Sequence, residues 1–182
     1  MEFRLSYRGE LKGNGDPQHK HSLRRHFHAQ LSELWKQAPL ASRPDLTAEP
    51  SLPNSVSLSM RLGAFRFVPL VSSKLHGVAE LDVVMLRPGA PGKILKGGGD
   101  IDNRLKTLLD ALKVPDNNAL PAGCSPQSGE DPFYCLLEDD KLVTAVRLEA
   151  DRLLDAKNDR EVLLLIWVHT KHTEAIWANL GL

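Results

Sequence analysis

Alternation of apolar and polar residues recurs in short stretches along the chain, and it is the pattern of β-strands with one buried face. In the first stretch Phe3, Leu5 and Tyr7 are apolar, and the residues between them are charged or polar. On this basis we expect strands at residues 2–8, 56–62, 65–67, 80–85, 143–150 and 161–169.

Three of these strands carry further expectations. Residues 162–168 are nearly all apolar, so we expect the last strand to be buried on both sides. The connection at 151–160 is short, which predicts that the last two strands are antiparallel neighbours. On the 80–85 strand, Glu80 and Asp82 alternate with apolar residues and are assigned to its solvent face, with additional metal ligation as the alternative.

Helical spacing of apolar residues appears in two segments and in the C-terminal tail. The first segment begins near His19, and its apolar face consists of Leu23, Phe27, Leu31, Leu34 and Trp35. The face of the second consists of Ile101, Leu105, Leu108, Leu109 and Leu112. The tail, 173–180, predicts a short capping helix with Ile176 and Trp177 directed inward.

Two stretches rich in proline lack any period. We interpret 39–55 as a surface loop and 114–135 as a long irregular insertion. The order of elements is therefore strand, helix, three strands, helix, two strands, helix. This order predicts a single α+β (mixed α/β) domain over residues 1–182, with a mixed sheet and helices packed on it.

Composition places the chain among ordinary globular proteins. Hydrophobic residues make up 42% of it, charged residues 25%, and the formal net charge is zero. No apolar run reaches the length of a membrane span, and the first residues lack the apolar core of a secretory signal. The two cysteines, Cys124 and Cys135, favour a reduced, cytoplasmic protein, with a loop disulfide as the alternative.

Most of the candidate catalytic residues cluster at positions 97–110. A glycine run leads to Asp100, and Asp102, Lys106 and Asp110 then follow at steps of four residues, which aligns them along one flank of the second helix. Read separately, these residues are an N-cap, a partner of the helix dipole and a surface ion pair.

A second acidic cluster, Glu138-Asp139-Asp140, precedes another apolar run. Carboxylates from two elements are the ligands that Mg²⁺ prefers, since it takes oxygen donors and keeps several waters. A lysine beside such an ion would neutralise a phosphate oxygen.

The series Asp-Ile-Asp-Asn-Arg-Leu-Lys at 100–106, Leu-Asp-Ala-Leu at 109–112 and Glu-Asp-Asp at 138–140, followed by Val143, resembles the core signature of RusA-type Holliday-junction resolvases. That family consists of homodimeric, Mg²⁺-dependent endonucleases of mixed α/β fold. The connection between Asp110 and Glu138 is longer here than in the family.

The resemblance implies roles for individual residues. Asp100, Asp102 and Asp140 would bind Mg²⁺, with Mn²⁺ as a substitute, and Lys106 would be the active-site lysine. We expect Asp139, Glu138 and Asp110 in the shell around these ligands. The implied substrate is branched DNA, most simply a Holliday junction, and the implied assembly is a homodimer.

Other functions remain alternatives. One is a catalytically silent member of the fold that binds nucleic acid or a protein. Another is a structural protein in which the acidic motifs are caps and turns. A third is a metal-dependent nuclease for flaps, RNA or other branched substrates.

The segment 19–28 contains four histidines, but their spacing lacks the pairs at i and i+4 that one helical zinc site uses. We expect a solvated basic helix face there. Contact of that face with DNA phosphate is the functional alternative. The candidate nucleic-acid contacts are Lys20, Arg24, Arg25 and, on the second helix, Arg104.

Overall fold

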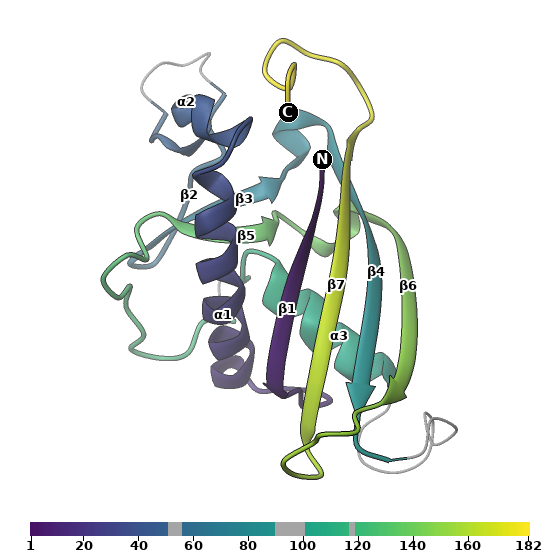
Figure 1. The fold of residues 1–182 in the computed structure, drawn as a ribbon. Coiled ribbons are helices and arrows are strands. Elements are labelled where there is room, and N and C mark those ends of the chain that lie inside the picture. Colours follow the sequence, from purple (N-terminus) through teal and green to yellow (C-terminus); the bar gives the residue numbers. More distant parts are fainter. Residues whose placement is uncertain (51–55, 90–100, 117–118) are drawn as a thin grey trace.

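A four-stranded sheet forms the larger layer of the molecule, in the order β1-β7-β4-β6 (Figure 1). Strands β1 and β4 are both antiparallel to β7, whereas β6 is parallel to β4. The structure is a computed structural model that describes residues 1–50, 56–89, 101–116 and 119–182. The strands are β1 (Glu2–Glu10), β4 (Gly77–Arg87), β6 (Val143–Arg152) and β7 (Glu161–His172).

A smaller sheet of three strands lies beside it, in the order β2-β3-β5. Its central strand β3 (Phe65–Val71) is antiparallel to β2 (Met60–Leu62) and parallel to β5 (Phe133–Leu137). The chain passes from the smaller sheet to the larger one between β3 and β4, and again between β5 and β6.

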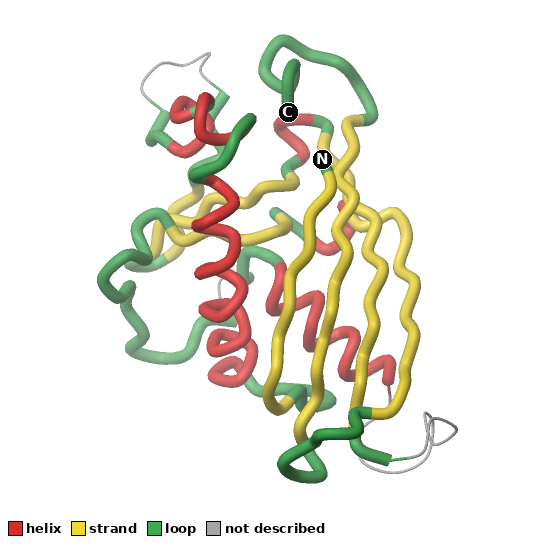
Figure 2. Tube along the Cα trace, viewed as in Figure 1, coloured by secondary structure: helices red, strands yellow, loops and turns green. Residues whose placement is uncertain are grey.

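Two long helices, α1 (Pro17–Trp35) and α3 (Ile101–Leu112), lie on one side of the larger sheet, and α3 crosses behind its strands in Figures 1 and 2. A short helix, α2 (Pro44–Thr47), lies beyond the end of α1. The Asp16 side chain accepts a hydrogen bond from the His19 backbone N–H and caps α1. Pro17 occupies the first turn of α1, where no backbone donor is needed.

The main hydrophobic core lies between the larger sheet and the two long helices, and it includes Leu5, Phe27, Leu81, Leu108 and Ile166. A second, smaller cluster of buried aromatic and aliphatic side chains lies on the three-stranded sheet. Together, the two layers confirm the predicted single α+β domain. The sheet is divided in two, because among the strands that the structure describes β2, β3 and β5 pair with one another and not with the larger sheet.

Several expectations about the strands are wrong. Strands β6 and β7 are not neighbours, because β4 lies between them and pairs with both. Nor is β7 buried on both sides: residues alternate between buried and half-buried along it, and Trp167 is on the half-buried face. Strand β5 begins at Phe133, inside the 114–135 segment that the sequence predicts to be irregular.

The loops and the tail also differ from expectation. Within 39–50 the chain forms a 3₁₀ turn and α2, and it buries Leu40 and Leu46 in the core. Residues 51–55 lie outside the described part. The tail beyond β7 forms turns instead of a helix, and Trp177 is 92% exposed.

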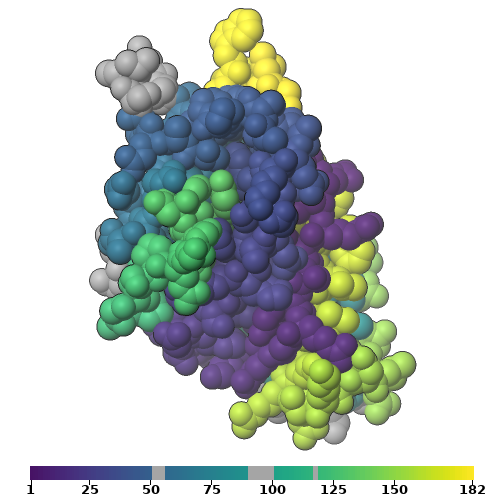
Figure 3. All heavy atoms as spheres, turned by 60° about the vertical axis from the view of Figure 1, so that its left-hand side comes forward, coloured from purple at the N-terminus to yellow at the C-terminus, as the bar shows by residue number. Residues whose placement is uncertain are grey.

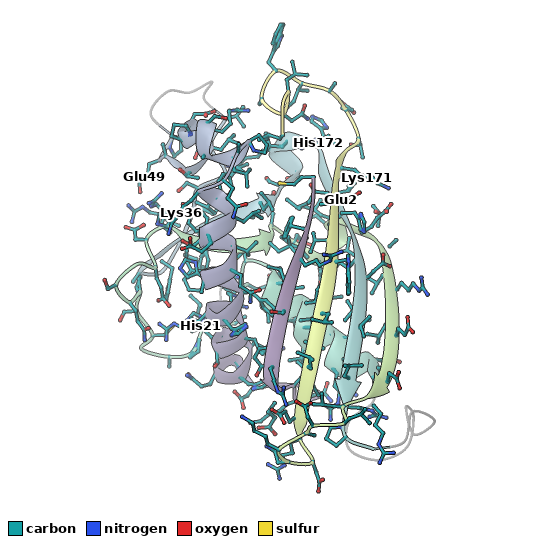
Figure 4. All side chains as sticks on the ribbon, viewed as in Figure 1. Glu2, His21, Lys36, Glu49, Lys171 and His172 are labelled. Carbon is teal, nitrogen blue, oxygen red and sulfur yellow. The ribbon has the colours of Figure 1, made fainter. Side chains whose placement is uncertain are left out.

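Glu80 and Asp82 lie on the exposed face of β4, as expected. Glu80 forms an ion pair with Lys171 of β7, the residue labelled in Figure 4. Cys124 and Cys135 are both free thiols, and burial raises the pKa of Cys135 to about 12. Among the helices that the structure describes, none has the length and apolarity to cross a bilayer.

Candidate functional site

Helix α3 is held in place by three contacts from α1 and the turn before it. The Gly15 N–H donates to Thr107 Oγ1 at 3.0 Å, and Lys20 Nζ lies 2.7 Å from Asp110 Oδ2. A Cβ at Gly15 would lie 2.8 Å from His19 Cδ2 and 2.9 Å from a methyl group of Thr107, so any other residue would force these side chains to move. The third contact comes from Arg24.

The guanidinium of Arg24 caps the C-terminal end of α3. Its Nε donates to the Lys113 carbonyl at 3.1 Å, and its Nη2 donates to the Asp110 carbonyl at 2.7 Å. These carbonyls have no partner within the helix, and a cation here is also favoured by the helix dipole. Burial lowers the pKa of Arg24, which is only 2% exposed. The expectation that Arg24 belongs to a solvated basic face is therefore wrong.

The acidic turn after β5 is hydrogen-bonded to the same end of α3. The Val114 N–H donates to the Leu137 carbonyl at 2.9 Å, and the Glu138 N–H donates to the Val71 carbonyl at 2.9 Å. The Glu138 carboxylate accepts hydrogen bonds from Ser72 Oγ and from the Ser73 N–H and Oγ. Glu138 therefore anchors the turn, and the two aspartates that follow it are placed beside α3.

Lys113 connects α3 to this turn. Its Nζ lies 3.5 Å from Asp140 Oδ2 and 3.7 Å from Asp116 Oδ2. Partial burial works against the charged amine, but Asp140, Asp116 and Asp110 together raise the pKa of Lys113. A backbone hydrogen bond from Lys141 is the main cause of the lowered pKa of Asp139, and a bond with Asp140 adds to it. The structure thus gathers Asp110, Lys113, Asp139 and Asp140.

The N-terminal half of α3 is different. Asp102 and Lys106 are exposed, and neither has an ion pair in the part of the chain that the structure describes. Asp102 is in the first turn and Lys113 follows the last, so at 1.5 Å per residue about 16 Å of helix separates their backbones. Asp100 lies outside the described residues. The predicted stripe of Asp102, Lys106 and Asp110 lies along α3, with Asp102 at its N-terminal end, whereas Asp140 lies on another element beside the C-terminal end.

The donors at both ends are carboxylate oxygens, which suit Mg²⁺ or Mn²⁺. Within residues 1–50, 56–89, 101–116 and 119–182, no group of three or more His, Cys, Asp and Glu side chains has metal-binding geometry. At the C-terminal end of α3 the described donors are therefore a pair, Asp139 and Asp140. At the N-terminal end the described donor is a single carboxylate, Asp102, and Asp100 lies outside the described residues.

The remaining candidate contacts on α1 are engaged in the fold. Arg25 Nε lies 2.8 Å from Glu130 Oε1, which fixes the insertion against α1 in Figure 3. His28 Nδ1 accepts the Tyr134 N–H, and its Nε2 lies 3.2 Å from the Gly129 carbonyl. His21, labelled in Figure 4, is only 1% exposed.

Sequence reasoning missed the structural use of the histidines. His21 and His28 follow the helical period of the apolar residues, with Leu23 and Phe27 nearby on the buried face. This helical period was the signal in the sequence that could have identified the two histidines as buried residues. Both rings stack near Phe133.

No family model, no curated protein and no solved structure matches this chain. The resemblance to RusA-type resolvases rests on the residue series alone.

Proposed function

We propose that the protein is a divalent-metal-dependent endonuclease that cleaves branched DNA. The observation that supports this most directly is the attachment of the Asp139–Asp140 turn to α3 through the Val114–Leu137 hydrogen bond. The same helix presents Asp102 and Lys106 to solvent without ion pairs in the described chain. Acidic groups therefore lie at both ends of α3, and an accessible lysine lies on the helix between them.

In this proposal Mg²⁺, or Mn²⁺ in its place, is held by carboxylates from the series Asp100, Asp102 and Asp140. When bound, such an ion neutralises phosphate charge and activates water. Because Asp102 lies at one end of α3 and Asp140 beside the other, they would hold separate ions, one bound by Asp102 and Asp100 and the other by Asp140 and Asp139. The ammonium of Lys106 lies between these ends and attracts the phosphate.

The homodimer and the Holliday-junction substrate in this proposal follow from the resemblance. A four-way junction has two equivalent strands to cut, so a two-fold homodimer would supply one site for each. A Holliday junction is accordingly the first substrate to test, and a reduced, cytoplasmic protein agrees with the two free thiols.

The test compares the unaltered protein with Asp102→Asn and Asp140→Asn on labelled junction, flap, duplex and single-stranded DNA. Mg²⁺, Mn²⁺ and EDTA are the three conditions. Asp116→Asn is the matched control, since Asp116 also lies beside Lys113 but is outside the acidic series. We expect metal-dependent cleavage that the first two variants lose and the control keeps. Cleavage that is equal in all four proteins would refute the assignment of these residues.

A non-catalytic binding protein is the second candidate. It is favoured by two ion pairs, Lys113 with Asp140 and Lys20 with Asp110, which stabilise the fold with the same residues. Such a protein would bind branched DNA in EDTA and cleave none of the four substrates in either metal.

A further inference from the structure

A cavity of about 520 Å³ lies at the end of the larger sheet where β1 and β4 finish and β7 begins, the lower end in Figure 1. Four basic side chains line it. Lys12 follows β1, Arg87 ends β4, Arg104 belongs to the first half of α3, and Arg160 precedes β7. Cavities of this size accommodate small ligands.

Three acidic residues, Glu10, Asp159 and Glu161, also line the cavity. The charge of Glu161 is already matched by Arg8, which is not part of the lining and places Nε 3.0 Å from Glu161 Oε1. Glu161 also accepts the Lys157 N–H at 2.6 Å. In the part of the lining that the structure describes, four basic residues stand beside two acids that Arg8 does not neutralise, Glu10 and Asp159, and Arg160 lies 3.8 Å from Glu10. The described lining therefore contains more basic than acidic side chains.

Arg104 is held in a fixed position at the cavity wall. Its Nη1 donates to the Leu11 carbonyl, which fixes the guanidinium at the cavity wall. The guanidinium of Arg87 also lines the cavity, so an anion there would offset the repulsion between these two positive charges.

We propose that this cavity binds a phosphate-bearing ligand through Lys12, Arg87, Arg104 and Arg160. Guanidinium groups match the oxygens of a phosphate in pairs, and lysine adds a point charge. The cavity contains none of Asp102, Lys106 and Asp140, so this binding does not depend on the proposed nuclease activity. The phosphate could belong to a nucleic-acid backbone or to a free nucleotide or inorganic anion, and the experiment separates these sources.

Binding is measured in EDTA at low salt with three probes: inorganic pyrophosphate, a nucleoside monophosphate and a short single-stranded DNA. The test variant is Lys12→Gln/Arg160→Gln, which removes two exposed cations. The matched control is Arg147→Gln, because Arg147 is as exposed as Arg160 and likewise lies 3.8 Å from a glutamate. We expect at least one probe to bind, with affinity reduced about tenfold or more in the test variant and unchanged in the control.

Asp159→Asn gives a test of opposite sign, since removal of a cavity acid should tighten binding. Binding of DNA alone identifies a nucleic-acid backbone as the source, whereas binding of pyrophosphate or nucleotide identifies a free ligand. Either result supports the proposal. The proposal is overturned if no probe binds, or if the double variant and Arg147→Gln behave alike. Failure of the nuclease proposal is seen separately, as an absence of cleavage in Mg²⁺ and Mn²⁺.

Discussion

The two ends of α3 carry the same kinds of charge and use them differently. At the C-terminal end, Asp110 forms an ion pair with Lys20, Lys113 lies beside Asp140, and Arg24 caps the last carbonyls. At the N-terminal end, Asp102 and Lys106 are exposed, and the described chain supplies neither with an ion pair.

This difference separates stability from function along one helix. The charges of Arg24, Lys20 and Asp110 at the C-terminal end are largely buried and have partners on other elements, so their loss should destabilise the fold. Charges at the N-terminal end contribute little to folding and remain accessible to a ligand. Substitutions at the two ends should therefore affect different measurements.

The largest expected effect is on stability, from Arg24→Met. Methionine fills much of the space but leaves the Asp110 and Lys113 carbonyls without their donor, which should cost about 3 kcal/mol of unfolding free energy. Urea denaturation followed by circular dichroism measures the loss. Lys36→Met, an exposed change at the residue that follows the last turn of α1, is the control and should cost less than about 0.5 kcal/mol. Similar losses for both would show that Arg24 does not hold α3.

The sequence predicts the local part of this fold well. Alternation identifies β1 and β4 because the buried face of a strand is encoded in consecutive residues, and the period of α3 places Asp102 and Lys106 on its exposed flank. The neighbours of β6 could not be predicted in this way. They depend on β4 pairing with both β6 and β7, which is decided by packing between segments distant in the chain.

The same limit applies to the candidate site: local spacing can be predicted from the sequence, whereas contacts between distant segments cannot. Spacing along one helix predicts that Asp102, Lys106 and Asp110 are aligned, but it cannot say which of them has a partner from elsewhere. Arg24 lies 86 residues before the Asp110 carbonyl that it caps. A basic residue on an amphipathic helix is ordinarily exposed, so its burial against α3 becomes visible only in three dimensions.

The second largest effect is on activity, from Lys106→Gln. If the ammonium stabilises charge on the phosphate, its removal should reduce cleavage about 100-fold, in the range known for the loss of one stabilising donor. Unfolding free energy should be unchanged, because Lys106 has no ion pair in the described chain. Cleavage rates on junction DNA and urea denaturation test the two halves of this prediction. A large loss of stability with Lys106→Gln would remove the contrast between the ends.

A pH effect comes next in size. The buried His21 has a pKa lowered to about 4 by burial and by the nearby charges of Arg24 and Arg25, against 6.5 for an unperturbed histidine. The unfolded chain therefore binds more protons below pH 6.5, and stability should fall as the pH is lowered from about 6.5 to 4. His21 accounts for up to about 1.4 kcal/mol per pH unit in this window, and burial lowers the pKa of His28 in the same direction.

His21→Phe isolates this contribution. The variant keeps an aromatic ring among Phe65 and Phe133 but cannot be protonated. Urea denaturation at several pH values should give a shallower fall in stability below pH 6.5 than in the unaltered protein. The slopes are compared, not the absolute stabilities, because the substitution also removes a contact with Arg24. Equal slopes would contradict the assignment.

The smallest expected effect is a coupling energy between two side chains, measured by a double-mutant cycle at each end of α3. Lys20 and Asp110 are 2.7 Å apart with side chains 24% and 19% exposed, so Lys20→Gln and Asp110→Asn should reveal a coupling energy of about 0.5–1 kcal/mol. The same cycle on Lys106 and Asp102 should give a value near zero, although their spacing of four residues permits a pair. Equal coupling in the two cycles would mean that Asp102 and Lys106 pair with each other in solution, and the N-terminal end would then be no more available to a ligand than the C-terminal end.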